Sequence, residues 1–272
     1  MKVRDALGDR CKSFEMAEAG RLAMQGLPLL ARLDGRAFHT FTRGMRRPYD
    51  EDMQRCMVET TKFLVDGLHA LIGYTQSDEI TLLWHEPDPK SQLPFGGRLQ
   101  KLMSVPAGMA SAKFARMAFA VWPARSSIIV PSFDCRVWQV PTLDDALEVF
   151  VWREDDATKN SVSMAARAHY SDKELHGQGR ADQMDMLMQK GVNWNDFPAA
   201  FKRGTYVRRV TAERYLTKEE LARIPAKHRP AADQLVKRST IETVDMPPIR
   251  RVSNAVEVLF VDATPSPKWC DA

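Results

Sequence analysis

The sequence lacks paired cysteines and long apolar runs. Its four cysteines (Cys11, Cys56, Cys135 and Cys270) are far apart and form no CxxC pair, which argues against a zinc cluster or a disulfide framework and fits reduced cytosolic thiols. The six histidines show no HExxH spacing. A membrane-spanning helix needs about 18 or more consecutive apolar residues, and no run in the sequence approaches this length. The first residues, MKVRDALGDRCKSFE, are charged throughout and are unlike a secretory signal. We therefore expect a cytoplasmic protein without membrane spans.

Neither sign of charge dominates the chain. With 39 basic and 35 acidic residues the net charge is +4, which permits a polyanionic partner without demanding one. The basic residues form short clusters, each of which is also typical of ordinary solvated surface: Arg43-Gly44-Met45-Arg46-Arg47, Arg98 with Lys101, Lys202-Arg203, Arg208-Arg209 and Arg250-Arg251. The 44% hydrophobic and 27% charged residues in a chain of 272 are typical of a globular protein with a buried core.

Apolar periodicity predicts a strand, a helix and two further strands in the N-terminal part. Asp50 is a good N-cap for the helix, and Gly73 is a plausible stop. The predicted elements are a buried strand at 27–33 closed by Asp34-Gly35, an amphipathic helix of about twenty residues after Asp50, and strands at 72–75 and 80–84 around a hairpin at 76–79.

The rest of the chain predicts more helix than strand. Pro106 should kink or restart the second helix, and Thr142 is the expected N-cap of the third, with Asp144 and Asp145 in its first turn. The predicted elements are a helix at 97–120, a strand at 133–140, helices from 142 to about 188, a strand at 205–210, a charged peripheral stretch at 211–246, a late strand at 255–261 and a tail at 265–268.

Two carboxylates are expected to meet at one edge of the predicted sheet. Asp34 ends the first strand, and Asp78 lies in the hairpin between the next two strands, followed directly by Glu79. Adjacent strands would bring Asp34 and Asp78 together, where they repel each other unless a cation lies between them. Mg²⁺ prefers such oxygen ligands, and two Mg²⁺ ions are the usual device for nucleotidyl transfer. The alternative is ordinary turn chemistry, since Asp-Gly and polar hairpin tips are common.

Basic groups near these acids favour a phosphate site. Arg36-Ala37-Phe38-His39 follows Asp34-Gly35, where a glycine-containing turn could approach phosphates and donate N–H groups. Arg98 and Lys101 are three residues apart, hence on one helix face, where they could clamp a triphosphate.

The same residues carry a family resemblance. RLDGRAFHTFT (32–42), RPYD (47–50), GYTQSDEITLLW (73–84) and GGRLQKLMS (96–104) resemble consecutive motifs of the tRNA-His guanylyltransferase family and its 3′-to-5′ polymerase branch. FDCRV (133–137), WREDDATKNS (152–161) and KRGT (202–205) match later blocks in order. The resemblance implies an α+β fold with a palm-type antiparallel sheet and helices packed on one face. It also implies a catalytic domain at 1–210 with a helical C-terminal half, and a peripheral segment at 211–272.

The resemblance also implies roles for individual residues. The expected catalytic residues are Asp34, Asp78 and Glu79, and the expected metal ligands are Asp34, Asp78 and the Gly35 carbonyl. Nucleotide contacts are expected from Gly35, Arg36, Ala37, Phe38, His39, Asp50, Ser77, Arg98 and Lys101, and tRNA contacts from Arg153, Asn160, Lys202 and Arg203. The implied cofactor is a pair of Mg²⁺ ions, the implied substrates are tRNA with GTP and ATP, and the implied assembly is a homo-oligomer, by family likeness a tetramer.

One departure from the family pattern bears on the substrate. Where guanylyltransferases of the eukaryotic type carry His-Ile-Asn-Asn, this chain has Thr158-Lys159-Asn160-Ser161. The change favours template-dependent repair of 5′-truncated tRNA, with GTP added first, over addition of a single G to tRNA-His. Two other hypotheses stay open: a palm-type nucleotide cyclase without an RNA substrate, and a noncatalytic RNA-binding module.

Overall fold

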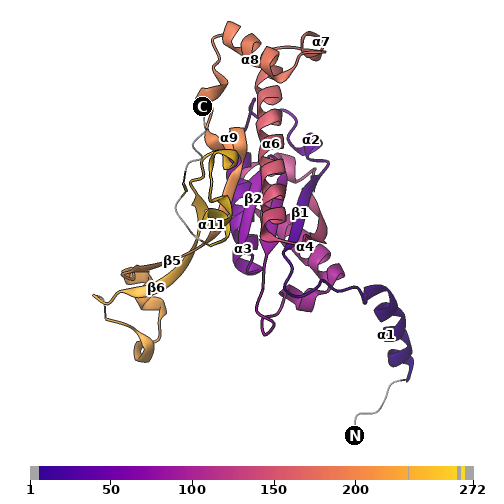
Figure 1. Ribbon diagram of the computed structural model, residues 1–272, viewed down its shortest axis with the longest axis vertical. Helices are drawn as coiled ribbons and strands as arrows, with labels where there is room; N and C mark the ends of the chain where they lie inside the picture. Colours follow the sequence, from indigo (N-terminus) through magenta and orange to yellow (C-terminus); the bar gives the residue numbers. More distant parts are fainter. Residues whose placement is uncertain (1–5, 232, 262–264, 267–272) are drawn as a thin grey trace.

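An antiparallel sheet forms the centre of the protein (Figure 1). The computed structural model describes residues 6–231, 233–261 and 265–266. Within these ranges six strands are ordered β4-β1-β3-β2-β5-β6, and every neighbouring pair is antiparallel. Their bounds are β1 Leu29–Arg36, β2 Ile72–Gln76, β3 Glu79–Trp84, β4 Ser132–Gln139, β5 Thr205–Arg214 and β6 Val236–Val244. The expected α+β class is confirmed.

The two capping residues expected from the sequence begin their helices. The Asp50 carboxylate accepts the backbone N–H groups of Asp52 and Met53, and Thr142 forms a reciprocal capping box with Asp145. Pro106 lies inside one continuous helix and does not restart it. The helices are α1 Ala6–Ala19, α2 Phe38–Phe41, α3 Glu51–Gly67, α4 Leu99–Val121, α5 Pro123–Ser126, α6 Leu143–Arg167, α7 Asp172–Leu175, α8 Arg180–Gln189, α9 Ala199–Arg203, α10 Lys218–Arg223 and α11 Ala255–Phe260, with 3₁₀ turns η1 Pro94–Gly97, η2 Trp194–Asp196, η3 Ala226–His228 and η4 Ile249–Arg251.

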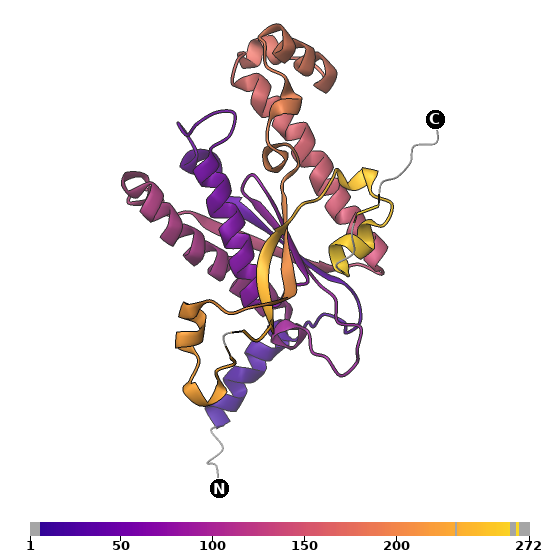
Figure 2. The ribbon, with the colours of Figure 1, turned by 90° about the vertical axis from the view of Figure 1, so that its left-hand side faces the viewer.

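Helices cover both faces of the sheet, which corrects the expected one-sided packing (Figure 2). Side chains alternate along β1, so Leu29, Ala31 and Leu33 enter a core shared with α3 and α4. Leu30 points the other way into a second core with α6 and α11. The two faces of β1 therefore belong to two apolar cores, and a one-sided sheet could not bury both sets of side chains.

Two predictions for the secondary structure were wrong. Gly73 lies inside β2 and stops no helix, because α3 already ends at Gly67. Residues 255–260 form α11 and not a strand. Ala255, Val258 and Leu259 follow the i, i+3, i+4 spacing of a buried helix face, a pattern that a short apolar run does not distinguish from a strand.

The predicted division at residue 210 falls inside β5. The first residues of β5 pair with β2, and residues 206–214 pair with β6. The distal part of this hairpin projects from the body (Figures 1 and 2). The chain then returns, and 246–260 packs against α6. Of the predicted tail, 265–266 is described and 267–268 lies outside the described residues. No helix in the described part is long and apolar enough to cross a membrane.

Candidate active site

Asp34 and Asp78 meet at one end of the sheet. Asp34 lies near the end of β1, and Asp78 is in the two-residue turn that joins β2 to β3. The Gly35 N–H donates to the Asp78 carbonyl over 3.0 Å, which joins the turn to β1. Ser77 adopts a left-handed φ of 49° and donates its hydroxyl to the Asp78 carboxylate over 3.1 Å. The tight hairpin therefore holds the second acid beside the first.

The two carboxylates affect each other electrostatically. Burial raises the pKa of Asp78, and the nearby Asp34 charge raises it further, against hydrogen bonds from its own backbone and Ser77 and the attraction of His39. The described residues contain no cluster of three or more His, Cys, Asp or Glu side chains that could hold a metal. Two carboxylates beside backbone carbonyls nevertheless fit Mg²⁺, which commonly uses one or two carboxylates and completes its shell with phosphate oxygens and water.

The turn after Asp34 is fixed by an aromatic anchor. Phe38 is 2% exposed and lies against the rings of Phe41, Phe114 and Phe133 at centroid distances of 5.1–5.7 Å. Ala37 takes a left-handed φ of 55°, which turns the chain into α2. Phe38, predicted to contact nucleotide, thus contributes through the core, whereas Arg36, Ala37 and His39 are exposed around the turn.

A cleft of about 620 Å³ opens beside Asp78. Four arginines contribute to its lining, and methionines with Tyr49 and Phe201 supply apolar surface. The cleft is lined in part by the predicted site residues Phe38, His39, Asp50, Ser77, Asp78 and Asn160 and by Arg43, Arg46, Arg47 and Arg167. A cationic rim over an apolar wall suits a ligand that has both phosphates and a flat ring.

Within the single chain, Arg98 and Lys101 do not lie near Asp34 and Asp78. Arg98 forms a bridge with Leu22, and the Gly97 carbonyl accepts the Ala23 N–H. The adjoining residue Met24 hydrogen-bonds the side chain of Gln139, which pairs with the first residue of β1. The N-terminus of α4 therefore lies at the opposite end of β1 from Asp34, which corrects the expected arrangement of these two cations around the acids.

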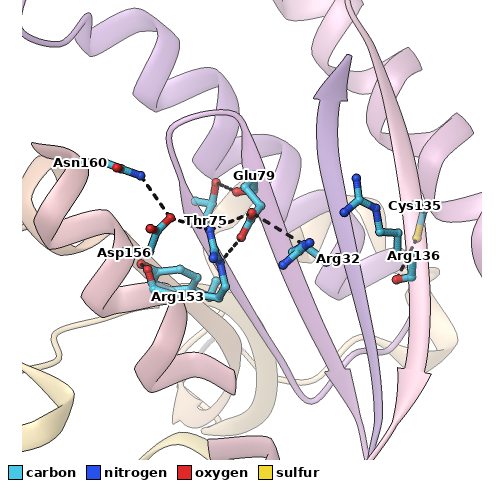
Figure 3. A network of polar contacts seen from close by, with 9 residues as sticks. Arg32, Thr75, Glu79, Cys135, Arg136, Arg153, Asp156 and Asn160 are labelled. Carbon is cyan, nitrogen blue, oxygen red and sulfur yellow. Dashed lines mark hydrogen bonds and ion pairs between the residues drawn. The ribbon is translucent and has the colours of Figure 1, made fainter. Parts of the chain in front are cut away.

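Glu79 and Arg153 form a buried ion pair (Figure 3). Arg153 Nε and Nη2 donate to the two oxygens of Glu79 over 2.6 and 3.0 Å, and Arg32 Nε lies 3.8 Å from Glu79. Burial raises the pKa of Glu79, against the attraction of Arg153 and Arg32. The guanidinium of Arg153, predicted to bind tRNA, is thus occupied by an internal partner.

Of the other predicted tRNA contacts, Asn160 on α6 lines the cleft, whereas Lys202 and Arg203 lie at the end of α9 and are not among its lining residues. Asn160 donates to Asp156 over 3.1 Å. Lys202 donates to the Asn195 carbonyl and lies over the ring of Trp194, and the Arg203 carbonyl accepts the Tyr74 hydroxyl over 2.8 Å. Sequence reasoning missed Asp134, which pairs with Asp34 across β1 and β4. The signal was present, since Asp134 occupies the face opposite the apolar side chains of its strand.

Two carboxylates at the end of an antiparallel sheet, next to a cationic cleft, are typical of palm-type enzymes of nucleotidyl transfer. The family model described as tRNAHis guanylyltransferase (Thg1) matches residues 8–141. A bacterial tRNA(His) guanylyltransferase-like protein solved with ATP is 32% identical, with a TM-score of 0.77 over 94% of this chain and 99% of that one. The chain belongs to the tRNA(His) guanylyltransferase family, and it is an enzyme of the nucleotidyltransferase class.

Two further matches agree with this assignment. A bacterial guanylyltransferase-like protein in complex with GTP is 31% identical over 94% of this chain and 99% of that chain, with a TM-score of 0.71. A probable tRNA(His) guanylyltransferase of Drosophila melanogaster is 26% identical over 212 residues, which are 73% of this chain and 71% of the relative.

Proposed function

We propose that this protein adds nucleotides, GTP first, to the 5′ end of tRNA in the 3′-to-5′ direction, by template-dependent repair of 5′-truncated tRNA. The observation that carries the proposal is the approach of Asp34 and Asp78 beside the arginine-lined cleft. It is supported by the similarity, along nearly the whole chain, to proteins solved with ATP and with GTP. A tRNA substrate also agrees with the cytoplasmic location proposed from the sequence.

The chain's own residues divide the work as follows. Asp34, Asp78 and the Gly35 carbonyl would hold Mg²⁺, which supplies activation of the attacking hydroxyl and neutralisation of the leaving pyrophosphate. Arg36 and His39 at the exposed turn, with Ser77 in the hairpin, would orient the triphosphate. We propose the cleft beside Asp78 as the nucleotide site and leave Arg98 and Lys101 outside it in the single chain.

Template use is proposed because Thr158 stands where the eukaryotic type has a histidine. Without that histidine, selection of one particular tRNA loses a contact, whereas pairing with the opposite RNA strand needs no side chain to read a base. Asn160, the residue of that block that is kept, lines the cleft.

The decisive experiment uses tRNAs that lack the first nucleotide and differ in the opposing base, incubated with Mg²⁺, ATP and each labelled nucleoside triphosphate in turn. We expect the complementary nucleotide to be added to each tRNA. Asp34→Asn and Asp78→Asn should each lower incorporation at least about 100-fold, because each removes a metal ligand. Asp185→Asn, on the exposed surface of α8, is the matched control.

Other outcomes would overturn the proposal in different ways. Addition of G alone, restricted to tRNA-His, would indicate a strict guanylyltransferase. Formation of a cyclic nucleotide without RNA would indicate a cyclase. Full incorporation by Asp78→Asn would refute the metal assignment.

The proposed assembly is a homo-oligomer, by family likeness a tetramer. Helix α1 buries none of its residues, and it exposes Leu7, Phe14 and Met16 by 63–71%. Leu7 and Phe14 are seven residues apart and so share one helix face, and exposed apolar side chains on one face are typical of a surface that another copy covers. Light scattering of the full chain should therefore give a mass above 30.8 kDa, and a monomer at micromolar concentration would contradict the proposal.

A further inference from the structure

Charged side chains of alternating sign form a line from β1 to α6 beside the candidate metal ligands (Figure 3). Arg32 is followed by Glu79, then by Arg153, then by Asp156. Arg153 Nη2 donates to Asp156 over 3.0 Å, and Asp156 also accepts the Asn160 amide, which lines the cleft. The spacing 153, 156, 160 places the three α6 members on one face of the helix.

The centre of this line is buried and geometrically strict. Glu79 and Arg153 are 8% and 6% exposed, and the guanidinium makes one hydrogen bond to each carboxylate oxygen. Such bidentate pairs fix the relative orientation of the two side chains as well as their distance. Thr75 also donates to the Glu79 carbonyl over 2.9 Å. Glu79 is the first residue of β3 and follows Asp78 directly. The start of β3 is therefore held next to Asp78 by both the side chain and the backbone carbonyl of Glu79.

We propose that Arg153 is a positioning residue for nucleotidyl transfer: it fixes, through Glu79, where Asp78 stands relative to Asp34, and Asp156 orients it. The inference rests on the proposed function in one respect, that Asp78 binds the metal. It gives Arg153 a role inside the protein that requires no contact with RNA. Residues that hold metal ligands in place typically change metal affinity or activity 10–100-fold when they are replaced.

Arg153→Lys tests the geometry of the pair. Lysine keeps the positive charge but cannot reproduce the two parallel hydrogen bonds. Asp156→Asn tests the same line from the other side, because it weakens the group that orients Arg153 and leaves both members of the central pair in place. Arg250→Lys is the matched control: Arg250 forms a comparable bidentate pair with Asp155 on the same helix, but that pair is exposed and does not include Glu79.

Thermal melting first checks that each variant folds. Two measurements on the full chain then test the inference. Amide hydrogen exchange of residues 75–80 in the ligand-free protein reports how firmly the hairpin is held. In Arg153→Lys we expect this exchange to be at least about 10-fold faster, kcat for nucleotide addition to fall about 10–100-fold, and KM for the nucleotide to stay within about twofold. Asp156→Asn should also speed hairpin exchange and lower kcat, but by less than Arg153→Lys does. Arg250→Lys should change neither the exchange nor kcat.

Unchanged hairpin exchange in a folded Arg153→Lys would overturn the inference, as would faster exchange with wild-type kcat. If Arg153→Lys does not fold, Asp156→Asn decides on the same two criteria. A wild-type protein that adds no nucleotide would refute the proposed function, whereas hydrogen exchange would still decide whether Arg153 fixes the hairpin. The two failures are therefore distinguishable.

Discussion

The Tyr206 hydroxyl donates a 2.9 Å hydrogen bond to the buried carboxylate of Glu154, which joins β5 to α6. The Ile249 N–H donates to the other oxygen over 2.9 Å. Burial nevertheless raises the pKa of Glu154 above its ordinary 4.5, against these two hydrogen bonds. The native state therefore binds more protons than the unfolded state as pH rises above 4.5, and the free energy of unfolding falls.

Glu154→Gln should remove this pH dependence. We expect the free energy of unfolding of wild type, minus that of Glu154→Gln, to decrease between pH 4.5 and neutral pH. Urea unfolding at several pH values measures it. Glu220→Gln is the control with the opposite sign: hydrogen bonds from Arg214 lower the pKa of Glu220 to about 2, so its contribution is present above pH 4.5 and is lost as pH falls towards 2. A flat difference for Glu154→Gln would contradict the prediction.

Gly35→Ala should destabilise the protein at the candidate site. A Cβ at this position would lie 2.5 Å from Phe38 Cδ2, and the ring cannot move away because it is packed in the aromatic core. We expect a loss of about 1–3 kcal/mol in the free energy of unfolding. In Gly108→Ala, inside α4, the added Cβ meets nothing within 4 Å, so a gain of about 0.5–1 kcal/mol is expected. Equal melting temperatures for the two variants would contradict the predicted clash between a Cβ at position 35 and the ring of Phe38.

Asp50 substitutions can separate helix capping from nucleotide binding. Asp50→Ala should cost about 0.5–2 kcal/mol, because two N–H groups at the start of α3 lose their acceptor. Asp50→Ser should keep most of the stability, since serine also caps helices. If the carboxylate contacts nucleotide, as the family resemblance implies, Asp50→Ser should raise KM for the nucleotide while the melting temperature changes little. Wild-type kinetics in Asp50→Ser would restrict Asp50 to its capping role.

Thiol labelling should distinguish the described cysteines. Burial raises the pKa of Cys56 to about 11, and burial with the Asp134 charge raises that of Cys135 to about 12. Since the thiolate is the reactive form, iodoacetamide at pH 7.5 should modify exposed Cys11 and leave both others intact. Peptide mass spectrometry measures the labelling, with urea-unfolded protein as the positive control. Rapid labelling of Cys135 in the folded chain would show that β4 opens.

Local sequence patterns predicted most strands of the sheet and the two acids of the candidate site, Asp34 and Asp78. Alternation and turn residues gave β1 to β5 within a few positions, and the two N-caps were correct because capping depends only on neighbouring residues. Residues 255–260 were misassigned because their helix is specified by contacts with α6, which are remote in sequence.

The site was predicted only where topology alone brings residues together. Asp34 and Asp78 follow from strand order, but the spacing of Arg98 and Lys101 gives a helix face and says nothing about which end of the sheet that face meets. The partner of Arg153 was likewise invisible, because 74 residues separate it from Glu79.

The two cores on either side of β1 become complete at different times during synthesis. The α3–α4 core draws almost entirely on residues up to 137, with Val207 and Ile241 as late additions. In the α6 core, half of the buried side chains come from 246–260. On the ribosome the first face can close early, while the apolar face of α6 stays partly open until the last segment emerges. That open face is where a chaperone would act, and where a chain stalled before residue 246 would aggregate.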